Sequence, residues 1–140
     1  MTHQSHPFRI GEVYTMRFDG SASEQAGLRP GLVFQNNKGN DHSPNLIALP
    51  MTTSIKKLHM PTHVLIRAGE SGLLADSVVI CENPQRISKD RVGRYITTLS
   101  PAQMKDVVRA NLLATSAISF LDQETLIEVW SKASRLNTVA

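Results

Sequence analysis

FRIGEVYTMRF, residues 8–18, is the stretch that decides how this chain folds. Its apolar residues recur mostly at every second position: Ile10, Val13, Tyr14, Met16 and Phe18. Successive side chains of a β-strand point to opposite faces, so this spacing predicts a strand with one face toward a core. Residues 19–29 then lose all apolar periodicity and contain two glycines, which predicts a long loop.

Five further short runs rich in apolar and β-branched residues follow this strand. They occupy residues 30–35, 46–52, 63–67, 77–82 and 95–99. Turn-rich segments separate them at residues 36–45 and 68–76, and a helical turn is expected near residues 88–92. Short strands at this spacing predict a mainly β protein built on a small, curled antiparallel barrel.

The last forty residues change to a helical pattern. Ser100, Pro101 and Gln103 have the order of a capping box with proline at the first helical position, so a helix is predicted to begin there. Its apolar stripe is expected to pack on the barrel and consists of Met104, Val107, Val108 and Leu112. A second amphipathic helix is predicted from Asp122 onward, with one face formed by Leu126, Val129, Trp130, Ala133 and Leu136.

Length and charge narrow the possible classes. A chain of 140 residues is long enough for one domain with one core. Residues 1–100 hold 11 Lys and Arg against 8 Asp and Glu and all five histidines, while residues 101–140 balance 4 against 4. A polyanion would therefore be drawn to the first hundred residues.

Several classes are excluded by what the sequence lacks. No apolar run is long enough for a transmembrane helix, and residues 1–7 lack the features of a signal peptide, so the expected location is the cytoplasm. The single cysteine, Cys81, excludes an internal disulfide and reads as a buried strand residue. No Walker loop, GxGxxG or HExxH is present, and the histidines at 3, 6, 42 and 59 lack ligand spacing, so neither a metal nor a cofactor is expected.

Arg29 is the first candidate for chemistry. If the polyanion is RNA and is cleaved without a metal, the site needs a base for the ribose 2′-proton, groups that stabilise the phosphorane, and an acid for the leaving 5′-oxygen. Arg29 follows the long loop and precedes Pro30, whose rigid ring fixes where the arginine enters its strand, as suits a phosphate clamp. The alternative is that Arg29 only pairs with Glu24 at the surface.

Other candidates sit at strand ends. Hydroxyls and cations gather where the third strand ends, at Thr52, Thr53, Ser54, Lys56 and Lys57. They could donate to a phosphate oxygen or simply satisfy the last backbone groups of the strand. His63, at a strand start, could do acid–base work or be structural, and Glu82, at a strand end, could accept hydrogen bonds from bases or cap a turn.

A series of short words in fixed order carries a family resemblance. They are GEVY (11–14), SEQAGLRP (23–30), VFQN (33–36), GN (39–40), SP (43–44), MT (51–52), PTHV (61–64), GLL (72–74), SVV (77–79), Glu82, Lys89, Arg91 and LS (99–100). Together they resemble the MazF/PemK (Kid-like) toxins, over roughly residues 8–121. The resemblance implies an SH3-like barrel and a homodimer. It further implies a metal-independent endoribonuclease that cleaves single-stranded RNA to a 2′,3′-cyclic phosphate and a 5′-OH, and an antitoxin whose disordered tail fills the RNA groove.

The resemblance also assigns site residues. The catalytic arginine of the family falls on Arg29 and its catalytic threonine on Thr52, while the acidic residue of the loop falls on Glu24, as general base or as a partner that holds Arg29. The positions expected to line the RNA path are Gln35, Asn36, Ser43, Lys56, His63 and Glu82, where bases would be read by hydrogen bonds and stacking.

The chain departs from the family in two places. Gln85 stands where many members have an arginine, and Arg86 follows it. The resemblance divides the chain into a flexible N-terminus (1–7), a toxin domain (8–121) and a C-terminal helical extension (122–140) that could cover the barrel, extend the dimer or bind the antitoxin. Alternatives on the same barrel are a gyrase poison of the CcdB type and an RNA-binding protein that does not cleave.

Overall fold

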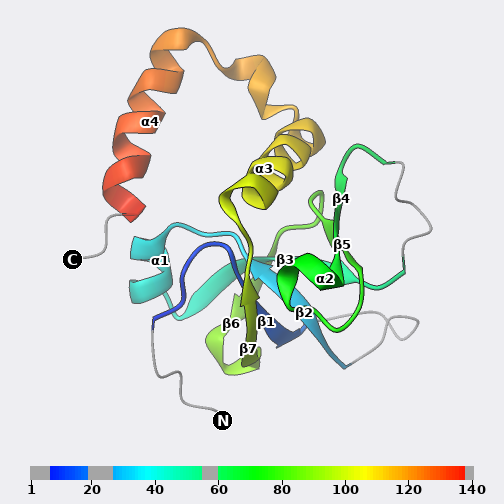
Figure 1. Ribbon diagram of the computed structural model, residues 1–140. Helices are drawn as coiled ribbons and strands as arrows, with labels where there is room; N and C mark the ends of the chain where they lie inside the picture. Colours follow the sequence, from blue (N-terminus) through cyan, green and yellow to red (C-terminus); the bar gives the residue numbers. More distant parts are fainter. Residues whose placement is uncertain (1–6, 19–26, 55–59, 138–140) are drawn as a thin grey trace.

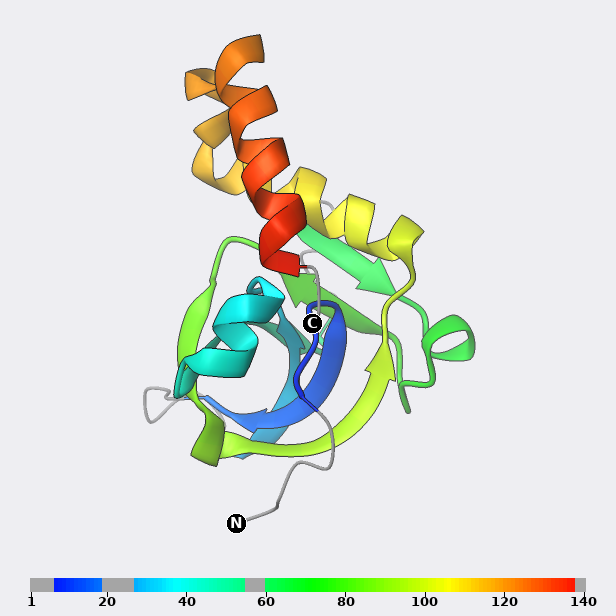
Figure 2. The same cartoon turned by 90° about the vertical axis from the view of Figure 1, so that its left-hand side faces the viewer.

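The computed structural model describes residues 7–18, 27–54 and 60–137 and is dominated by one antiparallel sheet (Figure 1). The strands are β1 (Glu12–Arg17), β2 (Leu28–Val33), β3 (Asn45–Thr52), β4 (His63–Ile66), β5 (Ser77–Ile80), β6 (Gln85–Ser88) and β7 (Val92–Thr98). Their order is β4-β5-β3-β2-β1-β7, with β6 also paired to β3. The sheet curls into a barrel-like shape without β4 pairing to β7 in the described residues, and this confirms the predicted fold class (Figure 2).

The helices are α1 (Asn37–His42), α2 (Ala68–Ser71), α3 (Pro101–Thr115) and α4 (Gln123–Asn137), with short 3₁₀ turns η1 (Lys89–Arg91) and η2 (Ala117–Phe120). The predicted capping box opens α3: Gln103 N donates to Ser100 Oγ at 3.1 Å, and Ser100 N donates to Gln103 Oε1 at 2.8 Å. These bonds satisfy backbone donors that the first turn leaves free.

Two clusters of buried side chains fill the space inside and behind the sheet. The first lies under α3 and includes Val13, Leu32, Leu49, Met51 and Val107. The second contains the alternating residues of β1, Tyr14 and Met16, together with Phe18. Both faces of β1 therefore contribute to the core, because Val13 packs in the first cluster while Tyr14 and Met16, on the opposite face, pack in the second. Cys81 belongs to the first cluster, as expected.

Some local predictions were wrong. The segment 36–45, expected to be a loop, contains α1, because the Asn36 side chain accepts a hydrogen bond from Gly39 N at 2.8 Å and caps the helix. Strand β6 was missed because its four residues carry little apolar pattern. Strand β1 begins at Glu12 rather than Phe8, since Gly11 turns the chain with a φ of 95°. Segment 68–76, expected to be a turn, contains the short helix α2.

The C-terminal helices differ in how they pack. In α3, Val107 is buried as expected, but Val108 is 43% exposed and Ala110 is buried instead. Helix α4 arches away from α3 and returns to α1, where Asn37 N donates to Asn137 Oδ1 at 2.9 Å (Figure 1). Its apolar face does not cover the barrel, and Trp130 is 75% exposed.

Candidate active site

Arg29 and Thr52 line the same cavity. Both strands that carry them are antiparallel, with Gly31 paired to Pro50, so extending this register by two residues would set Arg29 opposite Thr52. The cavity has a volume of about 450 Å³ and is also lined by Leu28, Pro30, Met51, Thr53 and Ser54. The structure thus brings a guanidinium and three hydroxyl side chains together from segments more than twenty residues apart in the sequence.

The Arg29 side chain contacts the Phe18 ring, while its Nε atom has no hydrogen-bond partner among the described residues. Its guanidinium carbon lies 5.5 Å from the centre of the Phe18 ring, a cation–π arrangement that favours the charged group at this position. Its Nε atom is buried and makes no hydrogen bond to any described residue. A buried donor without an acceptor is costly unless something supplies one, so this atom is suited to an anionic ligand.

Thr52 is oriented by the backbone that follows it. Ser54 N donates to Thr52 Oγ1 at 3.1 Å, which uses one lone pair of the hydroxyl and leaves its O–H able to donate. Thr53 and Ser54 are exposed beside it. The Glu24 and Lys56 assignments lie outside the described residues, on the segments that precede β2 and follow β3.

His63 and Glu82 form a pair away from this cavity. His63 Nε2 lies 3.0 Å from Glu82 Oε2, at the open ends of β4 and β5. Burial acts to raise the pKa of the Glu82 carboxyl, but its hydrogen bonds with His63, with the backbone and with Thr62, together with the charge of His63, outweigh burial and lower this pKa from its ordinary value. The carboxyl is therefore ionised at neutral pH.

Gln35, Asn36 and Ser43 lie at the other ends of β2 and β3. Gln35 lies six positions after Arg29, about 20 Å along an extended chain, and β2 ends at Val33 before it. Gln35 Nε2 donates to Asn40 Oδ1 at 3.1 Å, Asn36 caps α1, and Ser43 Oγ accepts from Asn45 N at 3.1 Å. The structure does not bring these three side chains to the Arg29–Thr52 cavity.

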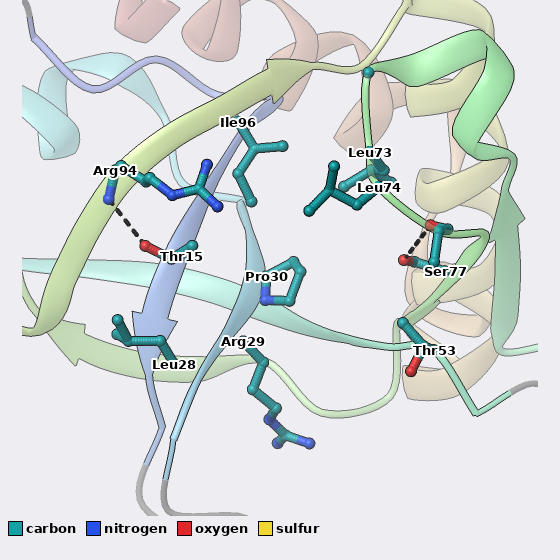
Figure 3. A pocket seen from close by; sticks show the side chains of 12 residues that line it. Thr15, Leu28, Arg29, Pro30, Thr53, Leu73, Leu74, Ser77, Arg94 and Ile96 are labelled. Atoms are coloured by element: carbon teal, nitrogen blue, oxygen red, sulfur yellow. Dashed lines mark hydrogen bonds between the residues drawn. The ribbon is translucent and has the colours of Figure 1, made fainter.

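Sequence reasoning missed a second cavity that adjoins the first. It has a volume of about 410 Å³ and shares Leu28, Arg29, Pro30 and Thr53 with the first cavity (Figure 3). Its new residues come from β1, β7 and the segment between α2 and β5, and include Arg94, Ile96 and Leu74. No motif marks Arg94, because only the curl of the sheet carries β7 to this position.

Other chemistry finds little support in the described residues. They hold no group of three or more His, Cys, Asp or Glu side chains placed to bind a metal ion. Burial, helped by the charge of Glu82, raises the pKa of the Cys81 thiol to about 12, so it stays protonated and is a poor nucleophile. In the same residues, no helix is long and apolar enough to cross a membrane.

The curled sheet, the covering helix and the cavity define a small barrel protein whose cavity is lined by an arginine and three hydroxyl side chains. The chain belongs to the PemK-like, MazF-like toxins of type II toxin–antitoxin systems, since the model of that family matches residues 9–114.

Curated relatives and solved structures agree with the family. The endoribonuclease MazF of Staphylococcus saprophyticus is 38% identical over 73% of this chain and 86% of its own length. The endoribonuclease EndoA of Bacillus subtilis is 41% identical over 70% of this chain and 84% of its own length. An endoribonuclease from Mycobacterial species, solved in complex with its cognate antitoxin, aligns with a TM-score of 0.63 at 26% identity, over 77% of this chain and 94% of that chain.

Proposed function

We propose that this protein is a toxin that acts in the cytoplasm as an endoribonuclease on single-stranded RNA. Its curated relatives carry the name endoribonuclease. The observation that carries the proposal is the shared cavity of Arg29 and Thr52, in which a buried guanidinium nitrogen has no acceptor among the described residues. A phosphodiester oxygen is the acceptor that such a nitrogen fits.

The proposed reaction needs no metal, because Arg29 supplies the positive charge. The ribose 2′-oxygen attacks the adjacent phosphorus, the bond from phosphorus to the 5′-oxygen breaks, and the products are a 2′,3′-cyclic phosphate and a 5′-OH. Arg29 stabilises the phosphorane and protonates the leaving oxygen, while Thr52 donates a hydrogen bond to a non-bridging oxygen. Glu24 takes the 2′-proton, or it holds Arg29 in place and the 2′-proton passes to solvent water.

Purified protein with a long single-stranded RNA and excess chelator tests this proposal. We expect cleavage at a limited set of sequences, with 2′,3′-cyclic phosphate and 5′-OH ends, because every charge that the reaction needs comes from side chains. Mapping both ends of each fragment is the measurement. Intact RNA, or 3′-OH ends, would contradict it.

Regulation and recognition follow from the same cavity. The mycobacterial endoribonuclease was solved in complex with its cognate antitoxin. We propose that an antitoxin also holds the present toxin in check, by covering the Arg29–Thr52 cavity. We expect the side chains around this cavity to contact the RNA at the cleaved bond. The His63–Glu82 pair lies near β5, the strand that pairs with β3, and we expect it to contact RNA farther from that bond. Contacts of Gln35, Asn36, Ser43 and Lys56 with RNA, and the homodimer, stay predictions.

Deleting residues 122–140 is expected to leave RNA cleavage close to that of the full chain. Helix α4 contacts the folded body through α1, and the family match ends at residue 114. The rate of cleavage by the shortened protein, beside its thermal midpoint, is the measurement. A gyrase poison of the CcdB type, which acts through its C-terminal residues, would instead lose its toxicity to growing cells on this deletion and would cut no RNA.

A further inference from the structure

We propose that the second cavity, beside Arg94, binds the base of a nucleotide that flanks the scissile phosphodiester, and that Arg94 is a specificity-determining residue. This inference rests on the proposed endoribonuclease function. The two cavities share Leu28, Arg29, Pro30 and Thr53, so a strand whose phosphate lies at Arg29 and Thr52 has its neighbouring base beside the second cavity.

The walls of the second cavity fit a base better than a phosphate. Arg94 and Ile96 extend from β7 on one side, Leu74 comes from the segment before β5 on the other, and Pro30 lies between them (Figure 3). Apolar side chains suit the flat faces of a base, whereas they cannot replace the hydration of a phosphate, which would find charged partners among the described residues only in the Arg29 and Arg94 guanidiniums. The volume of about 410 Å³ falls in the range of pockets for small ligands.

A backbone hydrogen bond holds Arg94 in place, and its side chain lines the second cavity. Arg94 N donates to Thr15 Oγ1 at 2.9 Å, and this bond fixes β7 against β1. Gly93 makes the approach possible, because a Cβ at that position would lie 2.2 Å from Thr15 Oγ1. The Arg94 guanidinium makes no hydrogen bond or ion pair that involves another described residue.

The hydrogen-bonding groups of the Arg94 guanidinium determine which bases it favours. It is planar, stacks on bases and carries only donors. Guanine, uracil and cytosine present a carbonyl oxygen to it, whereas adenine presents only ring nitrogens and an amino group that is itself a donor. The expected preference at this flanking position is therefore against adenine.

Four RNA oligonucleotides that differ only in one base beside the cleaved bond test the inference, with each flank varied in turn. The wild-type protein is expected to show different kcat/KM values for the four at one flank. Arg94→Ala is expected to bring the ratio of best to worst about tenfold closer to one, while kcat on the best substrate changes less than KM. Leu74→Ala removes part of the apolar wall from a side chain that is 96% exposed, so it should raise KM without loss of folding.

Arg109→Ala is the matched control, since it removes one positive charge from the surface of α3, outside both cavities. An Arg94→Ala variant that keeps the wild-type base ratios, or that slows all four substrates equally, as a mere loss of charge would, overturns the inference and leaves the endoribonuclease proposal standing. Failure of the wild-type protein to cut any RNA overturns both.

Discussion

Alanine at position 29 is expected to lower kcat for RNA cleavage by about two to three orders of magnitude, the cost of one donor aimed at developing charge. The partly buried Arg29 guanidinium lies over Phe18, and its Nε makes no hydrogen bond to a described residue, in the cavity that is also lined by Thr52. Removing it takes away the cation at the phosphorane and leaves no buried polar group behind. Single-turnover cleavage of a defined oligonucleotide measures the effect.

Arg29→Lys separates charge from geometry. Lysine keeps the positive charge but loses the planar fork of donors, so we expect it to recover only part of the rate. Both variants should keep a thermal midpoint close to that of the wild type, because a cation–π contact such as that of Arg29 with Phe18 is worth only about 1 kcal/mol. Wild-type kcat in the alanine variant would remove Arg29 from the mechanism.

Valine at position 31 is expected to destabilise the fold and to reduce cleavage together. Gly31 lies between β1 and β3, and a Cβ there would come within 2.5 Å of Met16 Sδ and 2.8 Å of the Phe18 ring. Both neighbours are buried and cannot simply turn into solvent. Overpacking of this kind costs about 1–3 kcal/mol, which corresponds to a fall of roughly 5 °C or more in the thermal midpoint.

The loss of activity follows because Phe18 is also the ring under Arg29. A displaced ring moves the guanidinium, so kcat should fall even at temperatures where the variant is folded. Thermal unfolding and cleavage at low temperature measure the two effects separately. Gly69→Val is the matched control, since a Cβ at Gly69 meets no atom within 4 Å. Equal midpoints for the two variants would show that the close approach at Gly31 has no energetic weight.

Much of the fold was predictable because its signals are local. Alternation in residues 8–18 indicated a strand with Tyr14 and Met16 on one face, and both are fully buried. Ser100 and Gln103 indicated the start of α3 to the residue, because a capping box is completed within four positions. Helix α1 was not predicted, because the signal for it is not local. Asn37 and Asn40 are typical loop residues in sequence, and only the tertiary structure shows that their side chains are hydrogen-bonded, Asn37 to Ile10 N and Asn40 to Asn37.

The candidate site was predictable only in part. Arg29 and Thr52 were assigned through a family resemblance in consecutive words of the sequence, and the structure brings them to one cavity. Arg94 was not assigned, because it lies 65 positions from Arg29 in the sequence and the residues next to it in the chain belong to no motif.

By itself, then, the sequence determined six of the seven described strands, the starts of α3 and α4 and the residues that resemble a ribonuclease toxin, since each depends on groups a few positions apart. Only the tertiary structure decided that Gln35, Asn36 and Ser43 lie away from Arg29, that Arg94 lines an adjoining cavity, and that α4 leaves its apolar face exposed. The physical reason is that strand register and sheet curvature are set by packing between distant segments, and no local pattern encodes them.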